Sequence, residues 1–147
     1  MPAFVVLVDL VFFASHRALH SRALYARVHA LHHAFPAPFA HAAVYAHPLE
    51  HLVSNVACIT AGPLLCGSHP ATAAAWAAAA VFSTTASHSG WALPWCDDRH
   101  DWHHACPIEH FGTAGMLLDR VLGTNAKYRA RAAAAAAGAA GDARKRA

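Results

Sequence analysis

The chain has 147 residues, a length that fits one domain. Hydrophobic residues make up 56% of it and charged residues only 13%, whereas a soluble domain usually carries about 25% charged residues. The net charge of +3 lies mostly after Lys127, which is too little and too local for a nucleic-acid-binding protein. The composition therefore favours a membrane protein with no nucleic-acid partner.

The first predicted element is an apolar helix over residues 2–15 that continues into His16 and Arg17. At about 1.5 Å per residue it is too short to span a hydrocarbon core about 30 Å thick, so we interpret it as the end of a membrane helix. His16 and His20 have the spacing HxxxH, which places both imidazoles on one face of a helix. Asp9 is costly inside an apolar helix without a partner, which Arg17, His16 or His20 would supply.

The second element is a short helix over residues 25–34, which carries His29, His32 and His33 in the spacing HxxHH. Pro36 ends it. Adjacent positions on a helix are splayed by about 100°, so the two neighbouring histidines point in different directions. This splay suits two neighbouring metal ions better than one.

A helical hairpin is predicted next. Proline and an early glutamate suit a helix N-terminus, so the sequence His47-Pro48-Leu49-Glu50 begins a helix. The apolar segments 52–66 and 71–87 are separated by a break at 67–70, which predicts a membrane hairpin. Each arm is near the lower length limit for a full span, so a re-entrant hairpin is the alternative. The hairpin returns the chain to His88, on the same side as His47.

The third histidine motif repeats the spacing HxxHH with His100, His103 and His104, and Asp101 lies between two of them. It predicts a short helix outside the bilayer. A further short helix is expected over residues 112–122.

The end of the chain is rich in alanine and closes with basic residues. We predict a membrane domain over residues 1–131 and a tail over 132–147 that is poorly ordered or a frayed helix without chemistry.

Eight clustered histidines at helical spacing are hard to explain by packing. The alternative, a solvated histidine-rich surface, is disfavoured because the clusters adjoin apolar segments. Imidazole titrates near neutral pH and is the commonest metal ligand in proteins. Because it suits zinc, copper, iron and nickel, ligand type alone does not identify the metal.

The ordered motifs resemble the fatty acid hydroxylase and sterol desaturase superfamily of integral membrane di-iron enzymes. Within it the chain is most similar to C4-methylsterol oxidases and fatty acid hydroxylase domain-containing proteins. The resemblance covers residues 9 to about 128 and rests on the three histidine motifs in order, on Tyr45 to His51, on His88-Ser89-Gly90-Trp91 and on Asp119 to Thr124. Family members usually carry further membrane helices upstream, where this chain has only a stub.

The resemblance implies which residues bind metal. Nine histidines match ligand positions: His16, His20, His29, His32, His33, His88, His100, His103 and His104. His47 matches a recurrent histidine of uncertain ligand status, whereas His41, His51 and His69 match no ligand position. His110 stands where family members commonly carry asparagine; either it replaces that asparagine near the metals, or the surroundings of the metals are impaired. Asp101 either orients a ligating imidazole through its second nitrogen or is a helix-end residue.

The resemblance also implies a function. It indicates an oxygen-dependent, non-haem di-iron monooxygenase that acts on a lipid, with a C4-methylsterol in sterol biosynthesis as the first candidate substrate. A fatty acyl or sphingolipid hydroxylase is the alternative within the family. The implied cofactors are two iron ions and O₂. The chain has no glycine-rich dinucleotide fingerprint and no haem or flavin motif, so electrons must come from outside it. The resemblance implies that NAD(P)H supplies them through cytochrome b5 and its reductase.

The expected location is the endoplasmic reticulum membrane, with several spans and the active face on the cytosolic side, because basic residues follow the last histidine motif.

Two other functions compete with the enzyme. A non-catalytic membrane protein could keep a structural metal site. A metal transporter is disfavoured because its ligands would lie near the bilayer midplane, whereas these motifs flank the hydrophobic segments.

Overall fold

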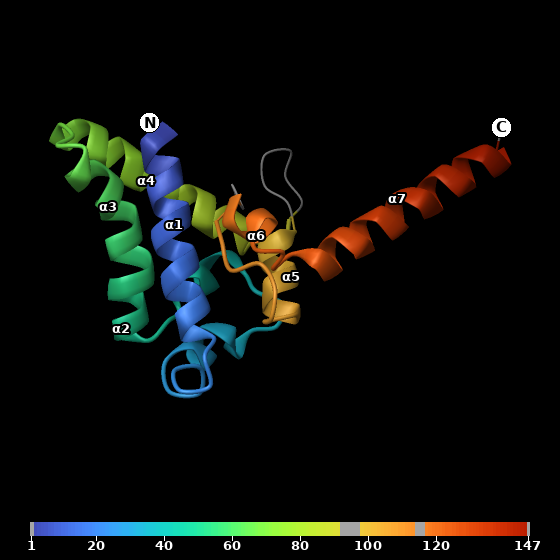
Figure 1. The fold of residues 1–147 in the computed structure, drawn as a ribbon, viewed down its shortest axis with the longest axis horizontal. Coiled ribbons are helices and arrows are strands. Elements are labelled where there is room, and N and C mark those ends of the chain that lie inside the picture. Colours follow the sequence, from blue (N-terminus) through green and yellow to red (C-terminus); the bar gives the residue numbers. More distant parts are fainter. Residues whose placement is uncertain (1, 92–97, 114–116, 147) are drawn as a thin grey trace.

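A computed structural model describes residues 2–91, 98–113 and 117–146, with side chains as far as residue 138 (Figure 1). All regular elements in the described part of the chain are helices, which confirms the predicted all-helical class. In chain order the elements are α1 (Pro2–Leu19), η1 (His29–Ala34), η2 (Ala40–Val44), α2 (Pro48–Glu50), η3 (His51–Val56), α3 (Ala57–Leu65), α4 (Pro70–Ser87), α5 (Arg99–Ala105), α6 (Leu117–Val121) and α7 (Ala126–Arg146). The second histidine motif lies on a 3-10 helix, η1, rather than on the expected α-helix.

The predicted hairpin is present as a pair of helices. Elements α2, η3 and α3 run on from one another, and α4 returns beside α3 after a turn in which Gly67 has a φ of +56°. Glycine adopts such a conformation without steric cost. Helix α1 packs along α3 (Figure 1). Gly62 permits this close approach, because a Cβ there would lie 3.1 Å from the Cα of Phe4.

A proline inside α3 ties the hairpin together. Pro63 has no N–H, so the carbonyl of Ile59, four residues earlier, loses its usual helical donor. The indole N–H of Trp76 on α4 donates to that carbonyl at 3.0 Å. The Trp76 ring also packs edge-on against Phe4 of α1, with 5.4 Å between the ring centroids. One tryptophan therefore joins α1, α3 and α4.

Asp9 has partners other than the predicted ones. The carboxylate is buried in α1 and accepts hydrogen bonds from the backbone N–H and the hydroxyl of Thr113, both at 3.0 Å. The N–H of Leu118 donates to its other oxygen at 3.4 Å. The prediction that Arg17, His16 or His20 would pair with Asp9 is therefore wrong. Uncharged N–H and hydroxyl groups thus satisfy the carboxylate, and their hydrogen bonds hold Thr113 and Leu118 against α1.

The Asp119 carboxylate binds the backbone just before Thr113. It accepts from the backbone N–H groups of Phe111 at 3.0 Å and Gly112 at 2.7 Å, and from the Thr124 hydroxyl at 2.5 Å. A Cβ on Gly112 would lie 2.7 Å from the Asp119 carboxylate and 3.0 Å from that of Asp9. Only glycine fits between the two acids.

Replacing Gly112 by alanine is therefore expected to push the loop away from both carboxylates. Steric strain of this kind typically costs about 1–3 kcal/mol. The measurement is the thermal unfolding midpoint of the purified variant in detergent, with Gly138→Ala on α7 as the control, because a Cβ there meets nothing. Equal midpoints for Gly112→Ala and the wild type would contradict the clamp.

Helix α7 leaves the body of the molecule and projects as a single helix (Figure 1). Glu109 caps its first turn, because its carboxylate accepts from the N–H groups of Lys127 at 2.7 Å and Tyr128 at 2.9 Å. The segment after Arg131 belongs to this helix. The division into a domain over 1–131 and a tail over 132–147 stays a prediction.

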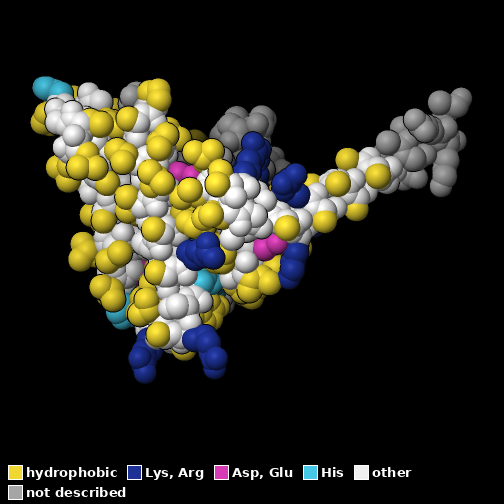
Figure 2. All heavy atoms as spheres, viewed as in Figure 1, with side chains coloured by type: hydrophobic (Ala, Val, Ile, Leu, Met, Phe, Trp, Pro, Cys, Tyr) yellow, Lys and Arg dark blue, Asp and Glu magenta, His cyan; other side chains and the backbone are white. Residues whose placement is uncertain are grey.

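The surface of the hairpin side is apolar. Figure 2 shows hydrophobic side chains spread over α1, α3 and α4. Leu64, Leu65 and Phe82 are among the most exposed. Among the described residues, α1 is the one helix that is both long and apolar enough to cross a membrane by length and composition. The prediction that this segment is too short is wrong, because the helix continues to Leu19.

Candidate metal centre

The structure brings all nine predicted histidines together in two adjacent groups. Within each group, one ring nitrogen from every member lies within 4.8 Å of the others. The first group consists of His16, His20, His29, His33 and His103. The second consists of His32, His88, His100 and His104. The groups touch, since the rings of His33 and His104 are 4.6 Å apart between centroids.

The two HxxHH motifs are divided between the groups by the same rule. His29 and His33, four residues apart, join one group, while His32 joins the other. His100 and His104 likewise share a group that excludes His103. On the α-helix α5, positions i and i+4 differ by about 40° and adjacent positions by about 100°, so the adjacent pair must diverge. The histidines of each motif therefore supply both groups, as expected for a pair of neighbouring ions.

Each motif also aligns the two rings that serve different groups. The imidazoles of His100 and His103 are stacked, with 5.5 Å between centroids and 28° between planes. Those of His29 and His32 are stacked in the same way, at 5.6 Å and 27°. The partition is thus the same on the 3-10 helix η1 and on the α-helix α5.

Backbone carbonyls fix the tautomer of several rings. A carbonyl oxygen can only accept, so a ring nitrogen that pairs with it must carry the hydrogen. The Nδ1 atoms so fixed are those of His16 (Phe111 carbonyl, 2.9 Å), His32 (Tyr45, 3.3 Å), His88 (Thr84, 2.7 Å) and His103 (Glu109, 2.5 Å). Each neutral ring then carries a bare lone pair on Nε2. The rings are held in the form that binds metal through Nε2.

These bare nitrogens face one another. The Nε2 atoms of His32 and His88 lie 3.4 Å apart, although both rings carry their hydrogen on Nδ1. His16 Nε2 is buried and has no hydrogen-bond partner among the described residues. Converging lone pairs repel unless a cation lies between them, so the donor set fits two metal ions bound by imidazole.

Glu50 is a functional candidate that the sequence reasoning missed, because its position suggested only a helix N-terminus. Its Oε1 lies 2.8 Å from Nδ1 of His29, and both side chains are buried. A carboxylate behind a ligating imidazole orients the ring and increases its basicity. The sequence feature that could have identified Glu50 is an acidic residue in a largely apolar region, 21 residues after His29.

Replacing Glu50 by glutamine should weaken metal binding, since loss of such a partner typically costs about 10- to 100-fold in affinity. The measurement is metal retention during titration with a chelator. Glutamine keeps the shape and loses the charge, so the fold should survive. Thr60→Val, on the exposed side of α3, is the control. Unchanged retention in Glu50→Gln would contradict this role.

His88 and His104, which lie outside the membrane helices, stay neutral well below pH 7. Burial, with smaller contributions from His32 and His88, lowers the pKa of His104 to about 3. Burial also lowers the pKa of His88 to about 4, although its hydrogen bond to the Thr84 carbonyl opposes the shift. Neutral imidazole is the form that binds metal.

A pH dependence of stability follows. Between a folded pKa near 4 and the unfolded value of about 6.5, the unfolded chain binds protons that the folded chain does not. The free energy of unfolding of the metal-free protein should therefore fall as the pH drops from about 6.5 toward 4. Thermal unfolding of chelator-treated protein across this interval measures the effect. A midpoint that stays constant or rises toward acid pH would contradict it.

Three other predicted residues lie outside both groups. His47 caps α2, where its Nδ1 accepts from the N–H of Leu49 at 3.2 Å. His110 packs edge-on against Tyr128, at 4.7 Å between ring centroids. Asp101 makes no hydrogen bond to a ligand histidine within the described ranges, and its buried Oδ1 has no partner. The role of Asp101 as an orienting residue or a helix-end residue stays a prediction, whereas Glu50 and backbone carbonyls contact rings of the two groups.

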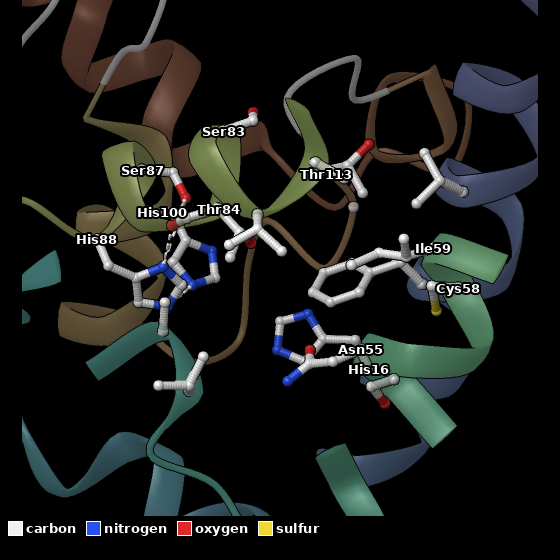
Figure 3. A pocket seen from close by; sticks show the side chains of 18 of the residues that line it. His16, Asn55, Cys58, Ile59, Ser83, Thr84, Ser87, His88, His100 and Thr113 are labelled. Atoms are coloured by element: carbon white, nitrogen blue, oxygen red, sulfur yellow. Dashed lines mark hydrogen bonds between the residues drawn. The ribbon is translucent and has the colours of Figure 1, made fainter. Parts of the chain in front are cut away.

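A cavity of about 730 Å³ leads to both groups. Its apolar part is lined by α1, α3 and α4 through residues such as Val8, Ile59 and Ala80. His16 of the first group and His100 of the second line its other end. Figure 3 shows His16 on one side of the space and His88 with His100 on the other. The volume and the mostly apolar lining are typical of a small-molecule site.

Comparisons with known proteins point in one direction. A family model described as fatty acid hydroxylase matches residues 1–124. Fatty acid hydroxylase domain-containing protein 2 of Homo sapiens is 36% identical over 131 residues, which cover 88% of this chain and 39% of that protein. Fatty acid hydroxylase ahd1 of Mycosarcoma maydis is 39% identical over 124 residues, covering 83% and 32%.

Methylsterol monooxygenase 2-2 of Arabidopsis thaliana is 34% identical over 139 residues, covering 86% of this chain and 52% of that protein. The chain thus spans about a third to a half of the length of these relatives. No solved structure matches it.

Proposed function

The chain belongs to the fatty acid hydroxylase family, and from this premise we propose that it is an oxygen-dependent di-iron lipid hydroxylase. The observation that carries the proposal is the apolar cavity that ends on both histidine groups. Such a cavity brings a lipid carbon to two adjacent ions and keeps bulk water away from them. The two ions would be held by the nine histidines, five on one and four on the other.

Iron bound at these groups would activate O₂ for the oxidation of an unactivated C–H bond. The chain's own residues prepare the site for this chemistry. Thr84, Phe111 and Glu109 hold ligand rings through their carbonyls, so that Nε2 presents its lone pair. The apolar wall from α1, α3 and α4 orients the hydrocarbon part of the substrate and excludes water. Electrons would come from NAD(P)H through cytochrome b5 and its reductase.

A membrane location is supported by the apolar surface. Helix α1 meets the length and composition of a membrane span, and exposed apolar residues cover α3 and α4 (Figure 2). We place the protein in the endoplasmic reticulum membrane, with several spans and with the histidine groups near the cytosolic face. A lipid could then enter the cavity from the bilayer, between α1 and the hairpin.

A C4-methylsterol is the first candidate substrate, because a methylsterol monooxygenase is among the relatives. Fatty acyl and sphingolipid substrates are the alternative, supported by the relatives that are named as fatty acid hydroxylases. The apolar cavity accommodates either class.

The proposal is tested in membranes that contain the protein, cytochrome b5, its reductase and NADPH. A 4,4-dimethylsterol and a set of fatty acyl lipids are supplied separately, and oxygenated products are measured by mass spectrometry. Metal analysis of the purified protein should give about two iron ions per chain. Zinc in place of iron together with no product from any lipid would overturn the proposal in favour of a structural metal site.

A further inference from the structure

Two polar atoms in the wall of the cavity lack hydrogen-bond partners within the described part of the chain. They are Oε2 of Glu50 and Oγ of Ser54, on residues whose exposed fractions are only 4% and 3%. Leaving such groups unpaired costs free energy, so in folded proteins they usually meet a ligand or an ordered water. Both residues line the cavity of about 730 Å³.

Glu50 and Ser54 lie close to the candidate metal centre. They lie four residues apart on the helical run of α2 and η3, so they share one side of it. The other carboxylate oxygen of Glu50 is held at 2.8 Å from Nδ1 of His29, a member of the first histidine group. A substrate group that contacts Glu50 therefore lies beside the ring of a ligand histidine.

The hydrogen-bonding properties of Glu50 and Ser54 determine which kind of substrate group they can bind. A carboxylate oxygen only accepts, whereas a serine hydroxyl can both donate and accept. An alcohol satisfies both, because its hydrogen goes to Glu50 while its oxygen accepts from Ser54. A ketone or an ether has no hydrogen for Glu50, and an anionic head group would bring a second negative charge next to it.

We infer that Glu50 and Ser54 form a subsite for the hydroxyl group of an uncharged lipid alcohol, which is oxidised at a carbon close to that hydroxyl. The inference rests on the proposed function and narrows its substrate class, since it favours a sterol over a free fatty acid. Arg99 also lines the cavity, beside His100, and an anionic lipid would be drawn to that end instead. The experiment separates these outcomes.

The test compares the wild type with Ser54→Ala in nanodiscs of phosphatidylcholine. Equilibrium binding and turnover are measured for a 4,4-dimethylsterol, for its 3-deoxy analogue and for palmitic acid. The wild type should bind the sterol alcohol about tenfold more tightly than the deoxy analogue, the effect of one buried hydrogen-bonded hydroxyl. Ser54→Ala should lose this preference by weakening only the binding of the alcohol.

The matched control is Thr60→Val, which removes a hydroxyl from the same helical run. Thr60 is exposed, its hydroxyl bonds to the Val56 carbonyl, and it does not line the cavity. It should keep the wild-type preference. Metal content should be unchanged in both variants, because the Ser54 hydroxyl makes no hydrogen bond to a histidine of either group within the described residues.

Failure of the subsite and failure of the proposed function give different results. If the sterol is oxidised but the wild type binds alcohol and deoxy analogue equally, the subsite is wrong and the proposed function stands. If the alcohol preference depends on Ser54 while no lipid is oxidised, the hydroxyl-binding subsite stands, whereas the proposed function and the oxidation near that hydroxyl are wrong. Tighter binding of palmitic acid than of the sterol would overturn the subsite in favour of an anionic lipid held near Arg99.

Discussion

Replacing His103 by alanine is expected to remove one of two metal ions and to abolish lipid oxidation. His103 belongs to the first histidine group, and His104 to the second. His104→Ala should therefore have the same effect on turnover through loss of the other ion. Since both ions are needed for the proposed chemistry, each variant should lose at least about 100-fold in product formation, a drop of about 2.7 kcal/mol in transition-state stabilisation.

The metal content distinguishes this expectation from general damage to the fold. Each single variant should retain about one ion per chain, and the double variant should retain close to none. His69→Ala is the control, because His69 lies at the tip of the hairpin, where its Nδ1 accepts from the N–H of Ala71 at 3.2 Å. Most of the activity should remain in it. Full metal content with wild-type turnover in His103→Ala would refute the assignment of ligands.

Filling the cavity is the second change with a large expected effect. Ala80 lies on α4 and lines the apolar part of the cavity. Ala80→Phe should place a ring in the space that a lipid chain or sterol nucleus would occupy. Turnover should fall by more than about tenfold while metal content stays full, because the histidine groups are untouched.

The control for this experiment lies two residues away on the same helix. Ala78 is exposed and does not line the cavity, so Ala78→Phe adds the same side chain outside it. It should keep wild-type turnover. Equal activity of Ala80→Phe and the wild type on every lipid that the wild type oxidises would show that the cavity is not the substrate site.

Much of the fold followed from local sequence patterns. The proline of His47-Pro48 begins α2 as expected, and the break at residues 67–70 separates α3 from α4. Such features depend on residues close together in the chain, where backbone sterics and missing N–H groups decide. The 3-10 form of η1 was not predicted, since the spacing of three between His29 and His32 fits both kinds of helix.

The candidate site was predictable in its members but not in its contacts. The spacing of His29, His32 and His33 gave the expectation of two ions, because adjacent rings diverge. It did not reveal that Glu50 stands behind His29, since this contact crosses 21 residues of intervening chain. The two roles offered for Asp101 came from its place between two motif histidines, and among the described residues its Oδ1 has no hydrogen-bond partner.

The sequence by itself thus determined the helical class, the hairpin and the set of histidines, because each is set by residues within one or two helical turns. Only the tertiary structure decided which histidines lie in the same group and how Asp9 is satisfied. Both depend on packing between distant segments: His16 meets His103, and Asp9 meets Thr113 across 104 residues. Local periodicity carries no information about such pairs, whereas burial of a charge or a lone pair requires that they form.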